Sequence, residues 1–343
     1  MVRTQTCFLL TTVLLLPLLS LLSMATGAGV YGASEVFGYA LGDPALLADD
    51  KLVMIIETLR LPRTLCALFV GVSLAAAATL LQSATRNPLA EPGLLGVNAG
   101  AVLGLITGLT YAGIASTYGY LLWSGLGALL GNLLVLGLGS LFGAGGPLRL
   151  ILVGVAINAI FGGLSSFLLM SNQVVLDQFR FWDLGSLAAA ELESLWLLLP
   201  VLLLGLVLAL LLSRALALLQ MGDAQARALG LRPTMIRTGV LLAATLMTAS
   251  AVSLAGPIGF LGFLAAYLGR QLDKSHIPRQ LLFSTLCGAL LLLSADILAR
   301  WLIQPFELPV GTLLALLGAP ILIGLIWHPH TNTQLGSGAH HEQ

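Results

Sequence analysis

Apolar runs of about 20 residues recur along this sequence, and no other feature constrains its fold as strongly. A run of this length can cross the hydrocarbon core of a bilayer as an α-helix, which satisfies its own backbone hydrogen bonds in lipid. We therefore predict an all-α, polytopic membrane protein. The runs place about ten transmembrane helices near residues 7–29, 61–83, 93–113, 118–142, 150–171, 195–216, 238–256, 258–272, 281–299 and 309–327. The run at 258–272 is short and rich in glycine, so nine or ten helices are expected.

The composition agrees with lipid as the main solvent, because hydrophobic residues make up 58% of the 343 residues and charged residues only 9%. The formal net charge is +0, and no basic domain of the kind that binds nucleic acid is present. No linker divides the chain, so residues 1–343 are predicted to form a single transmembrane domain with a short polar tail from about residue 328. Arg3 and the apolar run after it resemble a signal peptide, but the run is longer than a usual signal core, and we expect a retained first helix.

The distribution of lysine and arginine predicts the orientation, since cytoplasmic loops of membrane proteins carry an excess of both. With a cytoplasmic N-terminus, ten of the 15 basic residues lie in inner segments and five in outer ones. Both termini are therefore predicted to be cytoplasmic, with the chain in the cell inner membrane. The five outer exceptions are Lys51, Arg60, Arg63, Arg180 and Arg300.

The chain lacks the motifs of a catalytic or energy-converting site. It contains no G-x-x-x-x-G-K-[ST] phosphate loop, no H-E-x-x-H zinc motif and no G-x-S-x-G elbow. Its three cysteines lie apart in apolar stretches, without the spacing of a disulfide framework or a metal site. We therefore expect a transport subunit rather than an enzyme, with no cofactor or metal bound by this chain.

Acidic residues are scarce near the apolar segments, where only Glu91 and Asp296 occur. Transport coupled to protons or sodium usually relies on several buried acids. Asp296 precedes Arg300 by four residues on one helical face, an arrangement that favours a local ion pair. We therefore expect the energy source on another polypeptide, with a proton-coupled secondary transporter as the alternative class. A non-transporting membrane scaffold or sensor is a third class.

Three segments carry more specific motifs. Residues 60–100 read RLPRTLCALFVGVSLAAAATLLQSATRNPLAEPGLLGVNAG, and the prolines after Asn87 end one helix and start the next. Residues 221–237 read MGDAQARALGLRPTMIR and lie between two predicted spans. The third segment, residues 255–320, contains AGPIGFLGFLAAYLGR, GALLLLSADILAR and ELPVGTLLALLGAP.

In this order and spacing, the motifs resemble the FecCD-type permease family, the membrane subunits of ABC importers for ferric siderophores, haem and cobalamin. The resemblance covers residues 60–324 and implies a type II ABC importer permease of ten helices. It also implies a second permease subunit, identical or paralogous, two ATP-binding cassette ATPase subunits that use the ATP, and an external, periplasmic substrate-binding protein. Together with DQFRFWDLGSL at 177–187, the first segment is most similar to permeases for ferric catecholate siderophores. A haem or cobalamin permease is the alternative.

The resemblance assigns a docking role to three arginines. In the family, the arginines of RLPR and the arginine that closes ADxxAR lie on the outer face and meet acidic residues of the binding protein. By position these are Arg60, Arg63 and Arg300, which are three of the outer exceptions. Charge-assisted pairs with a docking partner would account for them. Snorkelling towards lipid headgroups, or pairing with Glu57 and Asp296, is the alternative.

Residues 222–237 match the coupling helix of the family, whose small-residue surface fits a cleft of the ATPase. A rigid contact of this kind can pass nucleotide-driven movement to the spans. A generic amphipathic loop is the alternative. The expected contact residues are Gly222, Asp223, Ala228, Leu229 and Gly230.

The resemblance also locates a cytoplasmic gate and a translocation cavity. The gate corresponds to the link GAGGPLR, where Gly145, Gly146 and Pro147 could form a hinge, although a tight turn would explain them as well. The cavity is expected at a dimer interface, and it should bind the chelate weakly so that release inward stays fast. Its candidate polar wall residues are Asn98, Asn158 and Ser165, whose alternative role is hydrogen bonding between packed helices.

One departure from the family pattern is plain. The family usually has Pro-His before the small-x-Arg of the eighth helix, whereas residues 265–270 here read AAYLGR, with Tyr267 in the place of the histidine. Without the proline, this helix should be straighter.

Overall fold

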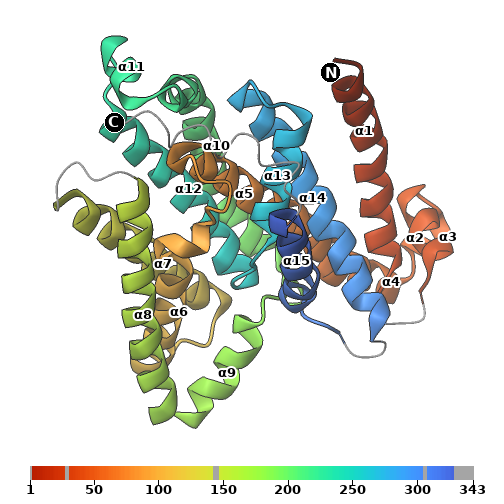
Figure 1. The fold of residues 1–343 in the computed structure, drawn as a ribbon. Helices are drawn as coiled ribbons and strands as arrows, with labels where there is room; N and C mark the ends of the chain where they lie inside the picture. Colours follow the sequence, from red (N-terminus) through yellow and green to blue (C-terminus); the bar gives the residue numbers. More distant parts are fainter. Residues whose placement is uncertain (1, 28–30, 142–146, 304–306, 328–343) are drawn as a thin grey trace.

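A computed structural model describes residues 2–27, 31–141, 147–303 and 307–327, and every regular element in these ranges is a helix (Figure 1). This confirms the predicted all-α class. The elements are α1 (Val2–Ala25), α2 (Ala33–Ala40), α3 (Pro44–Leu47), α4 (Asp50–Met54), the π-helical η1 (Ile55–Arg60), α5 (Leu61–Thr85), the 3-10 helix η2 (Pro92–Leu95), α6 (Val97–Thr107), the π-helical η3 (Gly108–Ala112), α7 (Thr117–Leu141), α8 (Pro147–Ser171), α9 (Gln173–Asp183), α10 (Leu192–Gln220), α11 (Asp223–Ala228), α12 (Pro233–Ala255), α13 (Leu261–Leu272), α14 (Ile277–Leu302) and α15 (Val310–Trp327).

Seven of the described helices are long and apolar enough to cross a membrane, namely α1, the continuous run from α4 to α5, α7, α8, α10, α12 and α14. The apolar helices Val97–Ala112 and Val310–Gly324 are shorter, and α13 has only 12 residues. Each predicted span therefore holds a helix, and the count of ten is approximate because three of the helices are short. The long helix α10 leads from the end of the bundle that carries α9 to the opposite end, where α11 lies (Figure 1).

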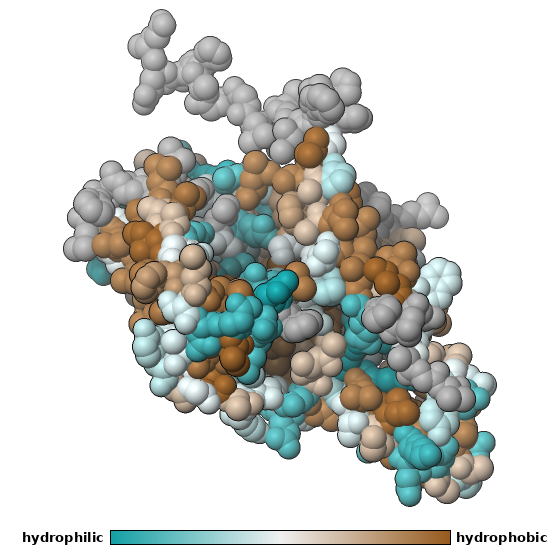
Figure 2. Space-filling view, turned by 90° about the horizontal axis from the view of Figure 1, so that it is seen from below, coloured by the Kyte–Doolittle hydropathy of each residue, from teal (hydrophilic) through white to brown (hydrophobic). Residues whose placement is uncertain are grey.

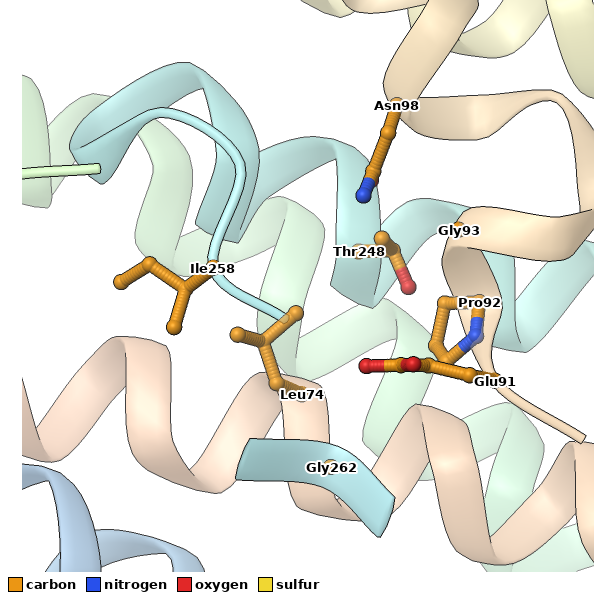
Figure 3. A pocket seen from close by; sticks show the side chains of 8 residues that line it. All are labelled: Leu74, Glu91, Pro92, Gly93, Asn98, Thr248, Ile258 and Gly262. Carbon is orange, nitrogen blue, oxygen red and sulfur yellow. The ribbon is translucent and has the colours of Figure 1, made fainter. Parts of the chain in front are cut away.

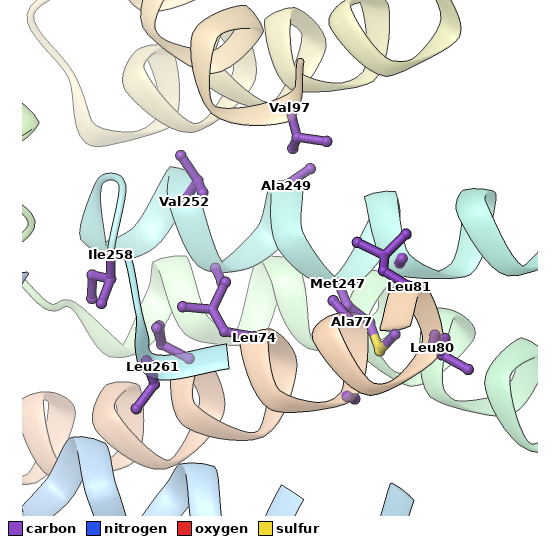
Figure 4. Packing of buried hydrophobic residues seen from close by; sticks show 14 of the residues in the cluster. Leu74, Ala77, Leu80, Leu81, Val97, Met247, Ala249, Val252, Ile258 and Leu261 are labelled. Carbon is purple, nitrogen blue, oxygen red and sulfur yellow. The ribbon is translucent and has the colours of Figure 1, made fainter. Parts of the chain in front are cut away.

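Helix α5 forms the centre of the bundle. In its most apolar window, 83% of the residues are buried inside the protein, against 11% for α1 at the periphery. Its neighbours are α12, α13 and α14, and apolar side chains of α5 and α12 interdigitate with the segment that leads into α13 (Figure 4). Small residues permit this crowding: a Cβ atom at Gly71 would lie 2.6 Å from the carbonyl oxygen of Gly288 on α14.

Helix α13 is short because the chain before it is not helical. Gly256 and Phe260 both adopt positive φ angles, of 71° and 65°, and residues 256–260 belong to no regular element. The adjoining connections are held together by backbone pairs: the N–H of Ser186 donates to the carbonyl oxygen of Ala255 at 2.9 Å, and the N–H of Gly311 donates to that of Gly185 at 3.0 Å. The break is therefore stabilised by protein, as non-helical backbone in a membrane protein must be.

The peripheral helices present apolar surface outwards. Only 17% of the apolar window of α8 and 22% of that of α10 are buried within this chain. Seen from the end that carries α9, the surface combines apolar regions with patches of hydrophilic residues (Figure 2). The outward apolar faces of α8 and α10 are suited to lipid or to another membrane subunit rather than to water.

Helices α6 and α7 cross at a row of glycines formed by Gly100, Gly104, Gly127 and Gly131. A Cβ atom at Gly127 would lie 2.8 Å from the Cα atom of Gly104, and one at Gly104 would lie 2.9 Å from the Cα atom of Gly127. Backbones can approach this closely only where side chains are absent.

We expect Gly127→Ala to lower the stability of the chain by about 1–3 kcal/mol, because the added methyl group overpacks this crossing. Gly163→Ala on α8 is the matched control, since a Cβ atom there would meet nothing within 4 Å. The control should be neutral or slightly stabilising, because alanine favours helix more than glycine does. Thermal unfolding of the detergent-solubilised protein measures both, and equal midpoints would contradict the packing argument.

Candidate functional site

A buried ion cluster occupies the α9 end of the bundle, where α1 ends, α5 begins and α14 ends. The carboxylate of Asp296, which is completely buried, accepts hydrogen bonds from Nε and Nη2 of Arg63, both at 3.0 Å to Oδ1. Its Oδ2 lies 2.8 Å from Nη2 of Arg300, one helical turn further along α14. Nη1 of Arg63 donates to Glu307 at 2.7 Å. Two cations thus face two carboxylates, as a cluster buried in protein requires.

Arg300 of this cluster and a third arginine, Arg60, also bind the end of α1. Arg300 donates from Nη1 to the carbonyl oxygens of Ser23 at 2.8 Å and Thr26 at 2.7 Å. Arg60 donates from Nη1 to the carbonyl oxygen of Met24 and from Nη2 to that of Tyr31, each at 2.9 Å. The guanidinium groups therefore satisfy backbone carbonyl groups in the last turn of α1 and just after it, where helical donors are missing.

Arg60, Arg63 and Arg300 are all buried, so in this chain their charges are used internally. The alternative pairing of these arginines with Asp296 is present, through Arg63 and Arg300. Glu57 does not pair with them in the same way but accepts a hydrogen bond from the hydroxyl of Tyr39 at 2.9 Å. The exposed carboxylate of the cluster is Glu307, whose side chain is 39% accessible. Contact of the three arginines with a binding protein stays a prediction, and the structure shows that they also hold three helices together.

The predicted coupling segment lies at the opposite end of the bundle, in the turn between α10 and α12. Gly222 begins it with φ 131°, α11 follows, and Gly230 closes it with φ 78°. Ala228, Leu229 and Gly230 are exposed, and the side chain of Leu229 is 60% accessible. This exposed tip suits contact with a partner.

Asp223 differs from the other predicted contact residues because its carboxylate faces inwards. Nη1 and Nη2 of Arg237 on α12 donate to its two oxygens at 2.9 and 2.7 Å. Arg86, at the end of α5, approaches Oδ1 at 3.4 Å. The hydrogen bonds from Arg237 are the main reason that the pKa of Asp223 is lowered, so the carboxylate is ionised at neutral pH. These bonds attach the start of α11 to α12, and contact of Asp223 with the ATPase stays a prediction.

The loop of residues 86–96, which contains the NPLAEPG motif and the short η2, is attached to α13 and α8. The carboxylate of Glu91 accepts the backbone N–H of Phe260, at the start of α13, at 2.8 Å. The side-chain amide of Asn158 on α8 donates to the carbonyl oxygen of Gly93 at 3.0 Å. Sequence reasoning placed Glu91 near the apolar segments but missed its partner, which lies 169 residues away along the chain.

A small pocket of about 10 Å³ lies beside this loop, lined by Leu74, Glu91, Pro92, Gly93, Asn98, Thr248, Ile258 and Gly262 (Figure 3). Its volume corresponds to one water molecule. Asn98 therefore lines a pocket, but not a large cavity within the single chain. Asn158 contacts the loop that forms the pocket, and Ser165 is buried further along α8 without a hydrogen-bond partner for its hydroxyl. A role for these three residues in a dimer cavity stays a prediction.

The remaining predicted positions are the three gate residues and the segment that forms α13. Gly145 and Gly146 lie outside the described residues, and Pro147 is the first residue of α8. Within α13, Arg270 donates to the side-chain carbonyl of Gln82 on α5, so this arginine holds α13 against the central helix. Among the described residues, no three His, Cys, Asp or Glu side chains gather as metal ligands.

The ion cluster predicts a large loss of stability for Asp296→Asn. Removing this charge leaves two buried guanidinium groups short of a counter-charge, which costs about 3–5 kcal/mol. Asp177→Asn is the matched control, because Asp177 and Arg180 form an exposed pair 3.9 Å apart on α9. The control should change the free energy of unfolding by less than about 0.5 kcal/mol. Denaturant titration compares the two variants, and similar small losses would show that the cluster does not stabilise the bundle.

Comparison with known proteins assigns this architecture. The profile of the FecCD transport family matches residues 14–328. The sequence is 42% identical over 315 residues to the ferric enterobactin transport system permease protein FepD of Escherichia coli, a match that covers 91% of this chain and 92% of FepD. It is 36% identical over 314 residues to the hemin transport system permease protein HmuU of Yersinia pestis, covering 90% and 93% of the two chains. A solved structure described as an inward-facing metal-chelate type ABC transporter superposes with a TM-score of 0.80 at 29% identity, covering 94% of this chain and 99% of that one.

Proposed function

The chain belongs to the FecCD transport family, and we propose that it imports a ferric catecholate siderophore across the inner membrane. It is a transport subunit, the membrane-spanning permease of an ABC importer for iron chelates of the siderophore or haem type, and not an enzyme. The observation that carries the choice of catecholate is the 42% identity, over nearly the whole of both chains, to a permease for ferric enterobactin.

The proposal includes three kinds of partner. A second permease subunit would cover an apolar face of this chain and complete the translocation pathway. Two ATPase subunits would supply the energy, because this sequence has no phosphate-binding loop. A periplasmic binding protein would deliver the chelate. In the proposed orientation, both termini and α11 face the cytoplasm, and α9 with the buried ion cluster faces the periplasm.

Docking of the binding protein is proposed for the end of the bundle that carries the ion cluster. Arg60, Arg63 and Arg300 lie there, and Glu307 is the member of the cluster that reaches the surface. An acidic residue of the partner would compete with Glu307 for Arg63, because both would be carboxylates that seek the same guanidinium group. Docking would then weaken the ion pair of Arg63 with Glu307, which joins α5 to the segment before α15.

Contact with the ATPase is proposed for the exposed tip of the coupling segment. Ala228, Leu229 and Gly230 would enter a cleft of the ATPase, with Leu229 as the apolar centre of the contact. Asp223 would hold this tip in place through Arg237. Alternating access then follows from rigid-body movement passed through α11 to the spans.

The substrate is tested by uptake in a strain that lacks the chromosomal permease. Cells that express this chain with its ATPase and binding protein should take up radiolabelled ferric enterobactin, and should show little uptake of haem or cobalamin. The same strain without the binding protein is the control, because delivery by that protein is part of the proposal. Uptake restricted to haem or to cobalamin would overturn the catecholate assignment and leave the chain as a permease for that substrate.

The energy source is tested separately. Dissipating the proton gradient while cellular ATP is maintained should leave uptake unchanged, because the buried acids Asp273 and Asp296 in the described part of the chain are both paired with arginines. Depleting ATP while the gradient is maintained should abolish uptake. The reverse pattern would favour a proton-coupled secondary transporter.

A further inference from the structure

Arg86 lies where helix α5 ends and the loop of residues 86–96 begins. It adopts φ 51°, a left-handed conformation unusual for a residue with a side chain, and its backbone N–H donates to the carbonyl oxygen of Gln82. This conformation turns the chain out of the helix. The side chain of Arg86 then contacts the end of α10 and the start of α11. Its Nη2 donates to the carbonyl oxygen of Leu219 on α10 and lies 3.4 Å from Oδ1 of Asp223 on α11.

Asp223 thus forms ion pairs with two arginines, and the two pairs differ in strength. Arg237 binds it through two short hydrogen bonds, and the side chain of Arg237 is only 16% exposed. Arg86 approaches at the longer distance of 3.4 Å, with side chains of Arg86 and Asp223 that are 42% and 33% exposed. An exposed pair of this kind adds little to stability. Arg237 therefore fixes α11 on α12, whereas Arg86 links α11 to a different part of the molecule.

The loop of residues 86–96, which begins at Arg86, is attached to α13 and α8. Five residues beyond Arg86, Glu91 accepts the N–H of Phe260, which precedes α13. Gly93 accepts the side-chain amide of Asn158 from the middle of α8. A displacement of α11 that moves Arg86 would therefore be passed along the loop to the start of α13 and to α8.

We propose that Arg86 is a positioning residue that transmits movement of the coupling segment to the loop of residues 86–96, and through it to α8 and α13. This inference rests on the proposed function, because it assumes that an ATPase moves α11. It assigns Arg86 to the conversion of ATP hydrolysis into transport, and not to binding of the ATPase or of the chelate. The link runs by hydrogen bonds from Leu219 and Asp223 to Arg86, along the chain to Glu91 and Gly93, and by hydrogen bonds to Phe260 and Asn158.

The test uses the complete transporter, reconstituted in liposomes with the ATPase and the binding protein loaded with ferric enterobactin. The measured quantity is the number of chelates imported per ATP hydrolysed. Arg86→Gln should lower this ratio about two- to fivefold, the range that corresponds to loss of an exposed ion pair. Arg86→Lys should restore part of the ratio because it keeps the charge. Copurification of the ATPase and the thermal midpoint should match those of the wild type.

Arg214→Gln is the matched control. Arg214 lies near the inner end of α10, outside the coupling segment, is exposed and forms no ion pair among the described residues, so its loss should leave the ratio unchanged. A double variant gives a second check: Arg86→Gln combined with Asp223→Asn should lower the ratio by less than the product of the two separate effects, since both changes remove the pair of Arg86 and Asp223.

Two results would overturn the inference. Arg86→Gln could behave like the Arg214→Gln control, which would show that the link transmits nothing. It could instead release the ATPase during purification, which would make Arg86 a binding residue. Failure of the proposed function is distinguishable from both, because the wild-type transporter would then show no ATP-driven uptake at all.

Discussion

Lipid offers no hydrogen-bond partners to a polypeptide backbone, and this constraint governs the structure. Helices satisfy it along their length, so each interruption must find partners within the protein. Two such interruptions, residues 86–96 and 256–260, provide hydrogen-bond partners for each other. Glu91 from the first accepts the N–H of Phe260 from the second, and Asn158 donates to Gly93. The breaks are thus mutually dependent, which makes them suitable for passing movement between helices.

The same constraint explains why the two groups of charges have different roles. Asp296 is withdrawn from solvent with Arg63 and Arg300, and burial is tolerated only because hydrogen bonds surround the carboxylate. Such a cluster holds α1, α5 and α14 rigidly. The pair of Arg86 and Asp223 is half exposed and weaker, so it can yield when a partner moves α11. Permanent attachment lies at one end of the bundle, and the adjustable link lies at the other.

Between these ends, small residues turn groups of helices into rigid bodies. Gly71 faces Gly288 where α5 meets α14, and Gly127 faces Gly104 where α6 meets α7. Close backbone contact leaves little room for sliding, so movement is expected between such groups rather than within them. A permease that contains neither motor nor capture protein needs this property, because it can only convert a push at one end into a change at the other.

The sequence alone determined the helical class, the positions of the spans, the family and the pair of Asp296 with Arg300, because apolar length, motif order and four-residue spacing are local properties. Tertiary structure decided what the charges do. Arg63 meets Asp296 across 233 residues, and Asp223 pairs with Arg237 and Arg86. It also fixed the start of α13, since Phe260 at that break donates to Glu91 in a distant loop. The physical reason is common to all three: side-chain partners at long sequence separation are chosen by packing, which no local pattern specifies.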